Sequence, residues 1–221
     1  MKTVHFKSKD GLQITADLYL TDKPRGFILL CHMGFFNRGE YKDTAPKLNA
    51  LGFSCMAIDQ RSGMKAYGVK NETSALAKQQ KLPTGYLDAK QDVEAGIDYL
   101  FKLDHSKPVI LVGSSYSASL ALLIASENDK VKAVAAFSPD EYLKKTNLAE
   151  SIRGLAKPAY VTSAKKEIKE KAKVIRFVNP KYITDFKPKV EGFHGTKVLW
   201  DSTEGNEGYW KSFKKFLLKF G

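Results

Sequence analysis

Gly113-Ser114-Ser115-Tyr116-Ser117 is the stretch that decides the fold of this 221-residue chain. It lies between an apolar run, residues 109–112, and a helical pattern rich in small residues. A chain that leaves a buried strand and turns at once into a helix has little room for side chains beside the turn. Small residues are therefore needed two positions before and after the tip, and Gly113 and Ser117 meet that need. Ser115, at the tip, is a candidate nucleophile.

Two other interpretations of this stretch stay open on its residues alone. Serine is a good N-cap, so the stretch could simply be a polar strand end that caps an ordinary helix. Ser117 is also flanked by small residues, Ser115 and Ser119, which leaves the register open in principle. Because the apolar run ends at Gly113, we favour Ser115 as the exposed residue.

The composition is typical of one globular domain, residues 1–221, with 43% hydrophobic and 11% aromatic residues. No stretch approaches the roughly 18 apolar residues that a membrane span needs, and the first residues lack the apolar centre of a signal peptide. We therefore expect a cytoplasmic protein without membrane attachment. Cys31 and Cys55 fall in apolar, strand-like runs, which is typical of buried reduced thiols.

The formal net charge of +12 suggests nucleic-acid or anionic-surface binding. However, the lysines are scattered over nearly every predicted helix and loop, with no arginine-rich block and no aromatic–basic RNA-binding signature. The pattern favours a basic, solvated surface and no nucleic-acid partner. The densest lysine cluster lies in the last helix, where apolar residues recur at helical spacing and predict core packing.

Hydrophobic periodicity predicts a chain of alternating strands and helices. The eight expected strands are residues 4–6, 13–19, 27–31, 53–58, 109–112, 133–137, 159–163 and 174–178. The expected helices are residues 41–51, 87–103, 115–127, 148–155, 166–171 and 209–220. The first two strands join through Asp10-Gly11, a hairpin signal, and the others alternate with helices, which implies parallel pairing by right-handed crossovers. We expect an α/β fold: a mostly parallel eight-stranded sheet with helices on both faces.

Two connections between these elements are long, residues 61–86 and residues 179–193. The segment after the sixth strand, residues 138–157, holds only about 20 residues, too few for a large lid. We therefore expect a site without a large lid, with residues 61–86 forming one wall. Ligands of open α/β sheets bind at the carboxyl ends of the strands, so candidate catalytic residues belong there.

A serine hydroxyl is a poor nucleophile at neutral pH and needs a base to take its proton. Of the four histidines, His105 precedes the strand that leads to Ser115 and so lies at the opposite sheet edge. His5 falls within the peripheral first strand, where it is structural. His32 ends the third strand at the correct edge, where it is expected to stabilise the following turn. His194 remains, in a glycine-flanked loop before the last helix, and is the predicted base.

A carboxylate must orient that base, and Glu167 follows the predicted seventh strand. Ser115, Glu167 and His194 then occur in a known chain order for nucleophile, acid and base. Asp140, after the sixth strand, is the alternative acid, and Glu167 could also be one more surface charge in a lysine-rich segment. We favour Glu167.

Two backbone N–H groups are the predicted donors to the oxyanion that forms during attack on a carbonyl. One belongs to Tyr116, directly after the nucleophile. The other belongs to Met33, in the loop after the third strand, where Gly34 permits a sharp turn.

Together these motifs resemble the α/β-hydrolase superfamily, and more closely its dienelactone-hydrolase-like branch of small, lidless bacterial serine hydrolases. The resemblance covers nearly the whole chain and is carried by residues 32–34 with 37–41, 58–63, 113–120, 163–167 and 194–195 before Leu199-Trp200. It implies Ser115, Glu167 and His194 as a catalytic triad. The chain departs from the pattern at two points, because dienelactone hydrolases proper use a cysteine nucleophile and because Ser117 replaces the last glycine of Gly-x-Ser-x-Gly.

Three further residues are expected at the carboxyl edge of the sheet and could line the substrate: His32, Glu40 and Arg61. Glu40 and Arg61 could instead form a structural ion pair, which we favour.

The expected function is that of a cofactor-independent serine hydrolase that cleaves a small carboxylic ester, thioester or lactone through an acyl-enzyme on Ser115. A peptidase or amidase is less favoured, because no propeller or lid domain is present to select peptides. The remaining alternative is a non-catalytic binding or scaffold protein with the same fold. No histidines and carboxylates cluster at metal-ligand spacing, so we expect no metal.

Overall fold

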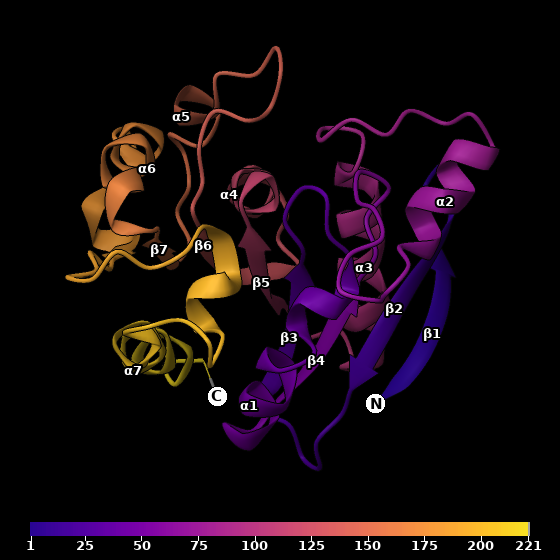
Figure 1. Cartoon of the computed structure of the whole chain (residues 1–221), viewed down its shortest axis with the longest axis horizontal. Coiled ribbons are helices and arrows are strands. Elements are labelled where there is room, and N and C mark those ends of the chain that lie inside the picture. Colours follow the sequence, from indigo (N-terminus) through magenta and orange to yellow (C-terminus); the bar gives the residue numbers. More distant parts are fainter. Residues whose placement is uncertain (221) are drawn as a thin grey trace.

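The computed structural model describes residues 1–220, which form one eight-stranded sheet with strand order β1-β2-β4-β3-β5-β6-β7-β8 (Figure 1). The strands are β1 (Lys2–Lys7), β2 (Gln13–Tyr19), β3 (Gly26–Cys31), β4 (Phe53–Ile58), β5 (Val109–Ser114), β6 (Val131–Phe137), β7 (Ala159–Thr162) and β8 (Ile183–Asp185). The α-helices are α1 (Thr44–Ala50), α2 (Glu72–Gln79), α3 (Lys90–Leu103), α4 (Tyr116–Glu127), α5 (Leu148–Ser151), α6 (Ile168–Ile175) and α7 (Asn206–Leu217). The short 3-10 helices are η1 (Arg38–Tyr41), η2 (Lys165–Glu167), η3 (Pro180–Tyr182) and η4 (Gly195–Leu199).

The strand pairing follows from the connections. β1 and β2 form the antiparallel hairpin predicted at Asp10-Gly11, and β2 also pairs antiparallel with β4. All pairs from β4 to β8 are parallel, because a helix returns the chain between them. The predicted α/β fold with a mostly parallel sheet is confirmed.

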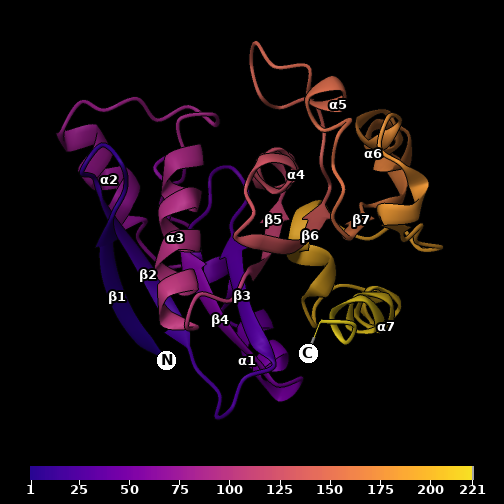
Figure 2. The ribbon, with the colours of Figure 1, turned by 180° about the vertical axis from the view of Figure 1, so that it is seen from behind.

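Helices cover both faces of the sheet, and each face has its own hydrophobic core. Side chains of α3, α4, α5 and α6 contribute to one core. Figure 2 shows the ribbon of these helices from behind. Side chains of α1 and α7 contribute to the other core (Figure 1). Within residues 1–220, no helix combines the length and apolar character needed to cross a bilayer.

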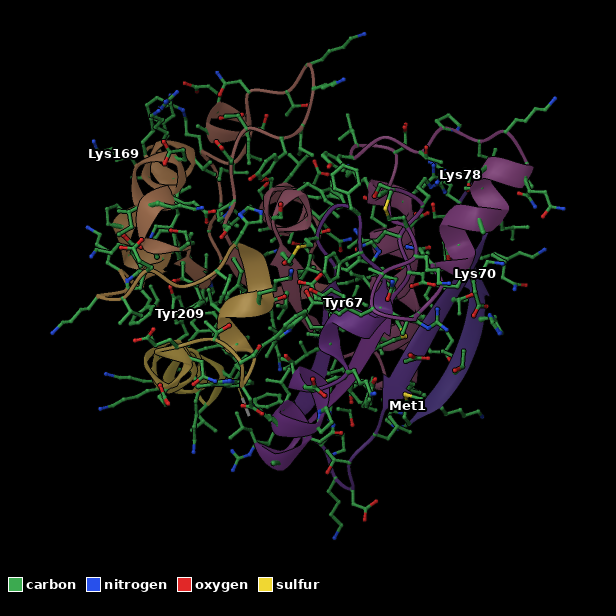
Figure 3. All side chains as sticks on the ribbon, in the orientation of Figure 1. Met1, Tyr67, Lys70, Lys78, Lys169 and Tyr209 are labelled. Atoms are coloured by element: carbon green, nitrogen blue, oxygen red, sulfur yellow. The ribbon has the colours of Figure 1, made fainter. Side chains whose placement is uncertain are left out.

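The centre of the sheet is apolar on both faces, which explains why β3, β4 and β5 read as continuous hydrophobic runs. The helix that follows β5, α4, is apolar around most of its circumference, because it packs deep between the sheet and its neighbours. The elbow between β5 and α4 therefore joins two buried elements at the centre of the fold. Lysines mark the periphery, as Lys70, Lys78 and Lys169 do in Figure 3.

The predicted eighth strand, residues 174–178, is wrong. Val174 belongs to α6, and Val178 lies just beyond its end; both are buried in the same core. Their spacing of four residues is helical, and an apolar run this short does not distinguish a helix from a strand. The real β8 has only three residues and begins at Ile183. Helix α2, within residues 61–86, was also missed, since its apolar residues are few.

Candidate active site

The turn from β5 into α4 is tight, as the sequence predicts, and its tip is strained. Ser115 has φ 60° and ψ −123°, a backbone conformation that is rare for a residue with a side chain. A Cβ placed on Gly113 would lie 2.2 Å from the carbonyl oxygen of Ser117, which explains why glycine is needed there. The turn holds Ser115 at the carboxyl end of β5, with 8% of its surface exposed.

The structure brings the three predicted triad residues into direct contact. Nε2 of His194 lies 2.7 Å from Oγ of Ser115, and Nδ1 of His194 lies 2.7 Å from Oε1 of Glu167. The neutral imidazole can therefore carry its proton on Nδ1, hydrogen-bonded to the carboxylate, and accept the serine proton at Nε2.

Glu167 is held from both sides by groups that stabilise its charge. Its Oε2 accepts hydrogen bonds from Oγ of Ser138 at 2.6 Å and from the N–H of Ala164 at 3.2 Å. Burial raises the pKa of Glu167, but its hydrogen bonds with His194 and Ser138 outweigh burial and keep the pKa below the usual range. The carboxyl group is therefore ionised at neutral pH and can orient the imidazole.

No hydrogen bond or ion pair joins the alternative acid, Asp140, to His194. Its side chain accepts a hydrogen bond from the N–H of Glu141, and its backbone N–H and C=O both bind Oγ of Ser119 in α4. Asp140 therefore fastens the loop after β6 to α4, and the geometry favours Glu167 as the acid.

The loop that carries the histidine is fixed to the rest of the site. Gly195 has φ 68°, and a Cβ there would lie 2.4 Å from Oγ of Ser114, so a larger residue would not fit. The next N–H, that of Thr196, donates to Oγ of Ser114 at 2.9 Å. Lys197 inserts its ammonium among three aromatic rings, with centroid distances of 4.8 Å to Phe36, 5.5 Å to Tyr67 and 5.2 Å to Trp200. Tyr67 is labelled in Figure 3.

The two predicted oxyanion donors differ in availability. The N–H of Tyr116 belongs to the first residue of α4, and within residues 1–220 no protein group accepts from it. The N–H of Met33 donates to Oε2 of Glu40 at 2.7 Å, so in this structure it is not free to bind an oxyanion. The N–H of Met33 is therefore not the free oxyanion donor that the sequence predicts, because Glu40 accepts its hydrogen bond.

None of the three residues predicted to line the substrate is exposed. His32 is fully buried; its Nδ1 lies 2.7 Å from the carbonyl oxygen of Met33, and its Nε2 accepts from the N–H of Gln60 at 3.0 Å. Burial lowers the pKa of His32 to about 4, so the ring is neutral and braces the loop after β3.

The predicted ion pair between Glu40 and Arg61 is also wrong. Arg61 is fully buried and pairs with Asp10 and Asp92, at 2.7 Å in each case. Glu40 instead accepts from Met33 and from the hydroxyl of Thr196, and is only 2% exposed. Both side chains stabilise loops behind the site. The sequence predicts that Glu40 and Arg61 lie near the carboxyl edge of the sheet. It does not predict which polar or charged groups each of them binds.

Ser117, which replaces the last glycine of the motif, has a structural role of its own. Its Oγ donates to the carbonyl oxygen of His32 at 2.5 Å and accepts from Nε2 of Gln60 at 2.8 Å. These bonds tie the start of α4 to the loop after β3. The replacement therefore supports the turn rather than disturbing it.

Two residues near the triad were missed by the sequence analysis. Ser138, directly after β6, donates to Glu167 and accepts from the N–H of Gly195, so it links the acid to the histidine loop. Its place at the carboxyl end of a strand was a usable signal. The ring of Tyr142 stands edge-on to that of His194, with centroids 6.5 Å apart. Nothing in the sequence marks Tyr142, because it lies in an irregular loop.

The family of the chain follows from comparison with known proteins. The model of the dienelactone hydrolase family matches residues 19–177. The chain belongs to the dienelactone hydrolase family. Membership of this family makes the protein a hydrolase. No curated protein sequence is similar enough to this chain to count as a relative.

Solved structures show the same fold at low sequence identity. The Pyrococcus furiosus esterase Pf2001 is 18% identical, with a TM-score of 0.75, covering 99% of this chain and 92% of the esterase. A thermostable carboxyl esterase of Bacillus coagulans is 12% identical, with a TM-score of 0.74, covering 99% and 98%. DcsB, solved with a substrate analogue, is 14% identical, with a TM-score of 0.76, covering 99% and 98%. The fold is thus that of α/β-hydrolases, and residues 1–220 include no large lid.

Proposed function

We propose that this dienelactone hydrolase family protein is a serine esterase that hydrolyses small carboxylic esters, thioesters or lactones without a cofactor. The observation that carries this proposal is the unbroken chain of hydrogen bonds from Ser115 through His194 to Glu167, with 2.7 Å at both steps. Short contacts of this kind are the signature of an activated nucleophile.

In the proposed reaction, Oγ of Ser115 attacks the carbonyl carbon of the ester while its proton passes to Nε2 of His194. The bond to the leaving oxygen then breaks, and His194 returns the proton to that oxygen. This leaves an acyl group on Ser115 and releases the alcohol. Water next attacks the acyl-enzyme, with His194 taking its proton, and the acid leaves as Oγ is protonated again. Glu167 keeps the imidazole oriented and stabilises its positive charge.

We assign one oxyanion donor to the N–H of Tyr116. We assign the second oxyanion donor to the N–H of Gly34, the residue after Met33 in the same turn. The Met33 N–H is taken by Glu40, whereas no protein group within residues 1–220 accepts from the N–H of Gly34. Two such donors, unpaired before the substrate arrives, lower the barrier without reorganisation.

The test is turnover of p-nitrophenyl acetate by the wild type and by Ser115→Ala and His194→Ala. Loss of either group typically lowers kcat by about 10⁴-fold or more, and the losses do not add. Ser126→Ala, on the same helix but bonded only to the carbonyl of Leu123, is the matched control and should retain wild-type turnover. An inactive wild type would favour the binding-protein alternative, and turnover by Ser115→Ala would refute the assignment of the nucleophile.

A further inference from the structure

A cavity of about 620 Å³ lies beside the candidate triad. Its volume falls in the range of ~300–1,000 Å³ that is common for small-molecule sites. The lining residues come from the loop after β3, from residues 62–88 and from the loop after β6. They include three aromatic residues, Phe35, Tyr86 and Tyr142, and three charged ones, Asp88, Lys144 and Lys145.

Two tyrosines connect this cavity to the reacting groups. Tyr142 lines the cavity, and its ring stands edge-on to that of His194, with centroids 6.5 Å apart. Tyr86, also in the lining, stacks on Tyr116, with centroids 4.1 Å apart and an interplanar angle of 12°. Two residues of the cavity wall therefore pack against His194 and against Tyr116, the residue that follows Ser115.

The third aromatic residue of the lining, Phe35, is held in an unfavourable state. Its backbone has φ 63°, in the left-handed region that a bulky side chain rarely adopts, and its side chain is 65% exposed. Backbone strain of this kind is unfavourable and clusters at ligand sites. Neither burial nor backbone geometry accounts for a phenyl ring at this position, whereas a ligand that packs against the ring would.

We propose that the cavity binds the alcohol portion of an ester whose alcohol carries a flat aromatic ring, packed against Phe35, Tyr86 and Tyr142. This inference rests on the proposed esterase function and narrows its substrates. Aromatic rings prefer offset-stacked or edge-to-face contacts with other rings, which the three side chains offer. The charges of the lining are mixed, two lysines and one aspartate, so ring shape rather than charge is the selecting feature.

The position of the imidazole assigns the alcohol rather than the acyl group to this cavity. His194 must protonate the leaving oxygen, so the leaving group departs beside the imidazole. Tyr142 is the cavity residue that faces the imidazole. The alcohol attached to that oxygen therefore extends toward Tyr142 and into the cavity.

The experiment compares benzyl acetate with cyclohexylmethyl acetate, which share a primary leaving group but differ in the flatness of the ring. The variant is Phe35→Gly, because glycine adopts positive φ without strain. An aromatic contact of about 0.5–1.5 kcal/mol corresponds to about a twofold to twelvefold effect on kcat/KM. We expect Phe35→Gly to lower kcat/KM for benzyl acetate by that factor relative to cyclohexylmethyl acetate, with Tm changed by no more than about 2 °C.

The matched control is Lys23→Gly, which removes a side chain from another exposed residue with positive φ, 47°, outside the cavity lining. It should leave the ratio of kcat/KM for benzyl acetate to kcat/KM for cyclohexylmethyl acetate as in the wild type. An unchanged ratio in Phe35→Gly would overturn the inference, as would a large fall in Tm with equal loss for both esters. The same comparison is made with ethyl phenylacetate and ethyl cyclohexylacetate, which carry the ring in the acyl group. If Phe35→Gly changes the kcat/KM ratio of this second pair only, the assignment of the cavity to the alcohol is overturned.

Failure of the esterase proposal itself is distinguishable from failure of this inference. In that case the wild type would hydrolyse none of the four esters, or Ser115→Ala would hydrolyse them as fast. If hydrolysis depends on Ser115 but Phe35→Gly leaves the kcat/KM ratio between the flat and the non-flat ester unchanged, only the aromatic cavity is refuted.

Discussion

Gly113→Ala offers a direct test of the tight turn that presents Ser115. Gly113 pairs with Cys31 and Ala136 in the neighbouring strands, so its backbone cannot move aside freely. The added Cβ would lie 2.2 Å from the carbonyl oxygen and 2.5 Å from the carbonyl carbon of Ser117, well inside the 3.4 Å at which ordinary contact begins. The start of α4 must therefore shift by roughly 1 Å, and Ser115 with it.

Two effects of known size follow. Inserting a methyl group into a tightly packed site costs about 1–3 kcal/mol, and each kcal/mol lowers Tm by about 2–4 °C in a chain of this length. A displacement of about 1 Å at a reacting group lowers the rate about 100-fold. We therefore expect Gly113→Ala to fold with a Tm reduced by about 2–12 °C and to lose about 100-fold in kcat/KM for p-nitrophenyl acetate.

The assay measures Tm by circular dichroism and initial rates on the same preparations. Gly154→Ala is the matched control, because a Cβ at Gly154 meets nothing within 4 Å and its φ is not positive. It should behave as the wild type in both measurements. The reasoning is refuted if Gly113→Ala keeps both Tm and kcat/KM, since the turn would then not constrain the nucleophile.

Three further predictions concern charged groups around the site. Glu167→Gln should abolish most turnover and Asp140→Asn should not; the opposite result would make Asp140 the acid. Because the folded-state pKa of Glu167 lies below 4.5, its stabilising effect is present above that pH and is lost as pH falls through the lower value. The Tm difference between wild type and Glu167→Gln should thus shrink below pH 4.5, and a constant difference would contradict this. Arg61→Met leaves the carboxylate of Asp92 buried without a cation and should cost about 3–5 kcal/mol in urea unfolding at pH 7. A cost below 1 kcal/mol would show that the pair is not needed.

The position of the candidate triad could be predicted because apolar runs in the sequence indicate where the strands of a parallel sheet begin and end. Ser115, Glu167 and His194 each follow a strand, and the carboxyl ends of parallel strands share one edge. The error in the eighth strand did not matter, since both the expected and the real strand precede His194. His194 was therefore expected at the correct sheet edge, although the strand predicted before it was wrong.

Pairings between buried charges could not be predicted in the same way. Arg61 had several carboxylates within reach of its loop, and only the packing of β1, β2 and α3 selects Asp10 and Asp92. The carboxylate of Glu40 reaches back to the N–H of Met33, a contact that depends on the exact path of an irregular loop. Periodicity carries no information on such loops, which is also why Tyr142 and the strained backbone of Phe35 were not anticipated.

The central claim is that Ser115 is the nucleophile, and covalent labelling tests it most directly. The wild type is incubated with a fluorophosphonate, digested and mapped by mass spectrometry. We predict one adduct, on the peptide that contains Ser115, and no adduct in Ser115→Ala. An adduct on another residue, or equal labelling of Ser115→Ala, would contradict the account.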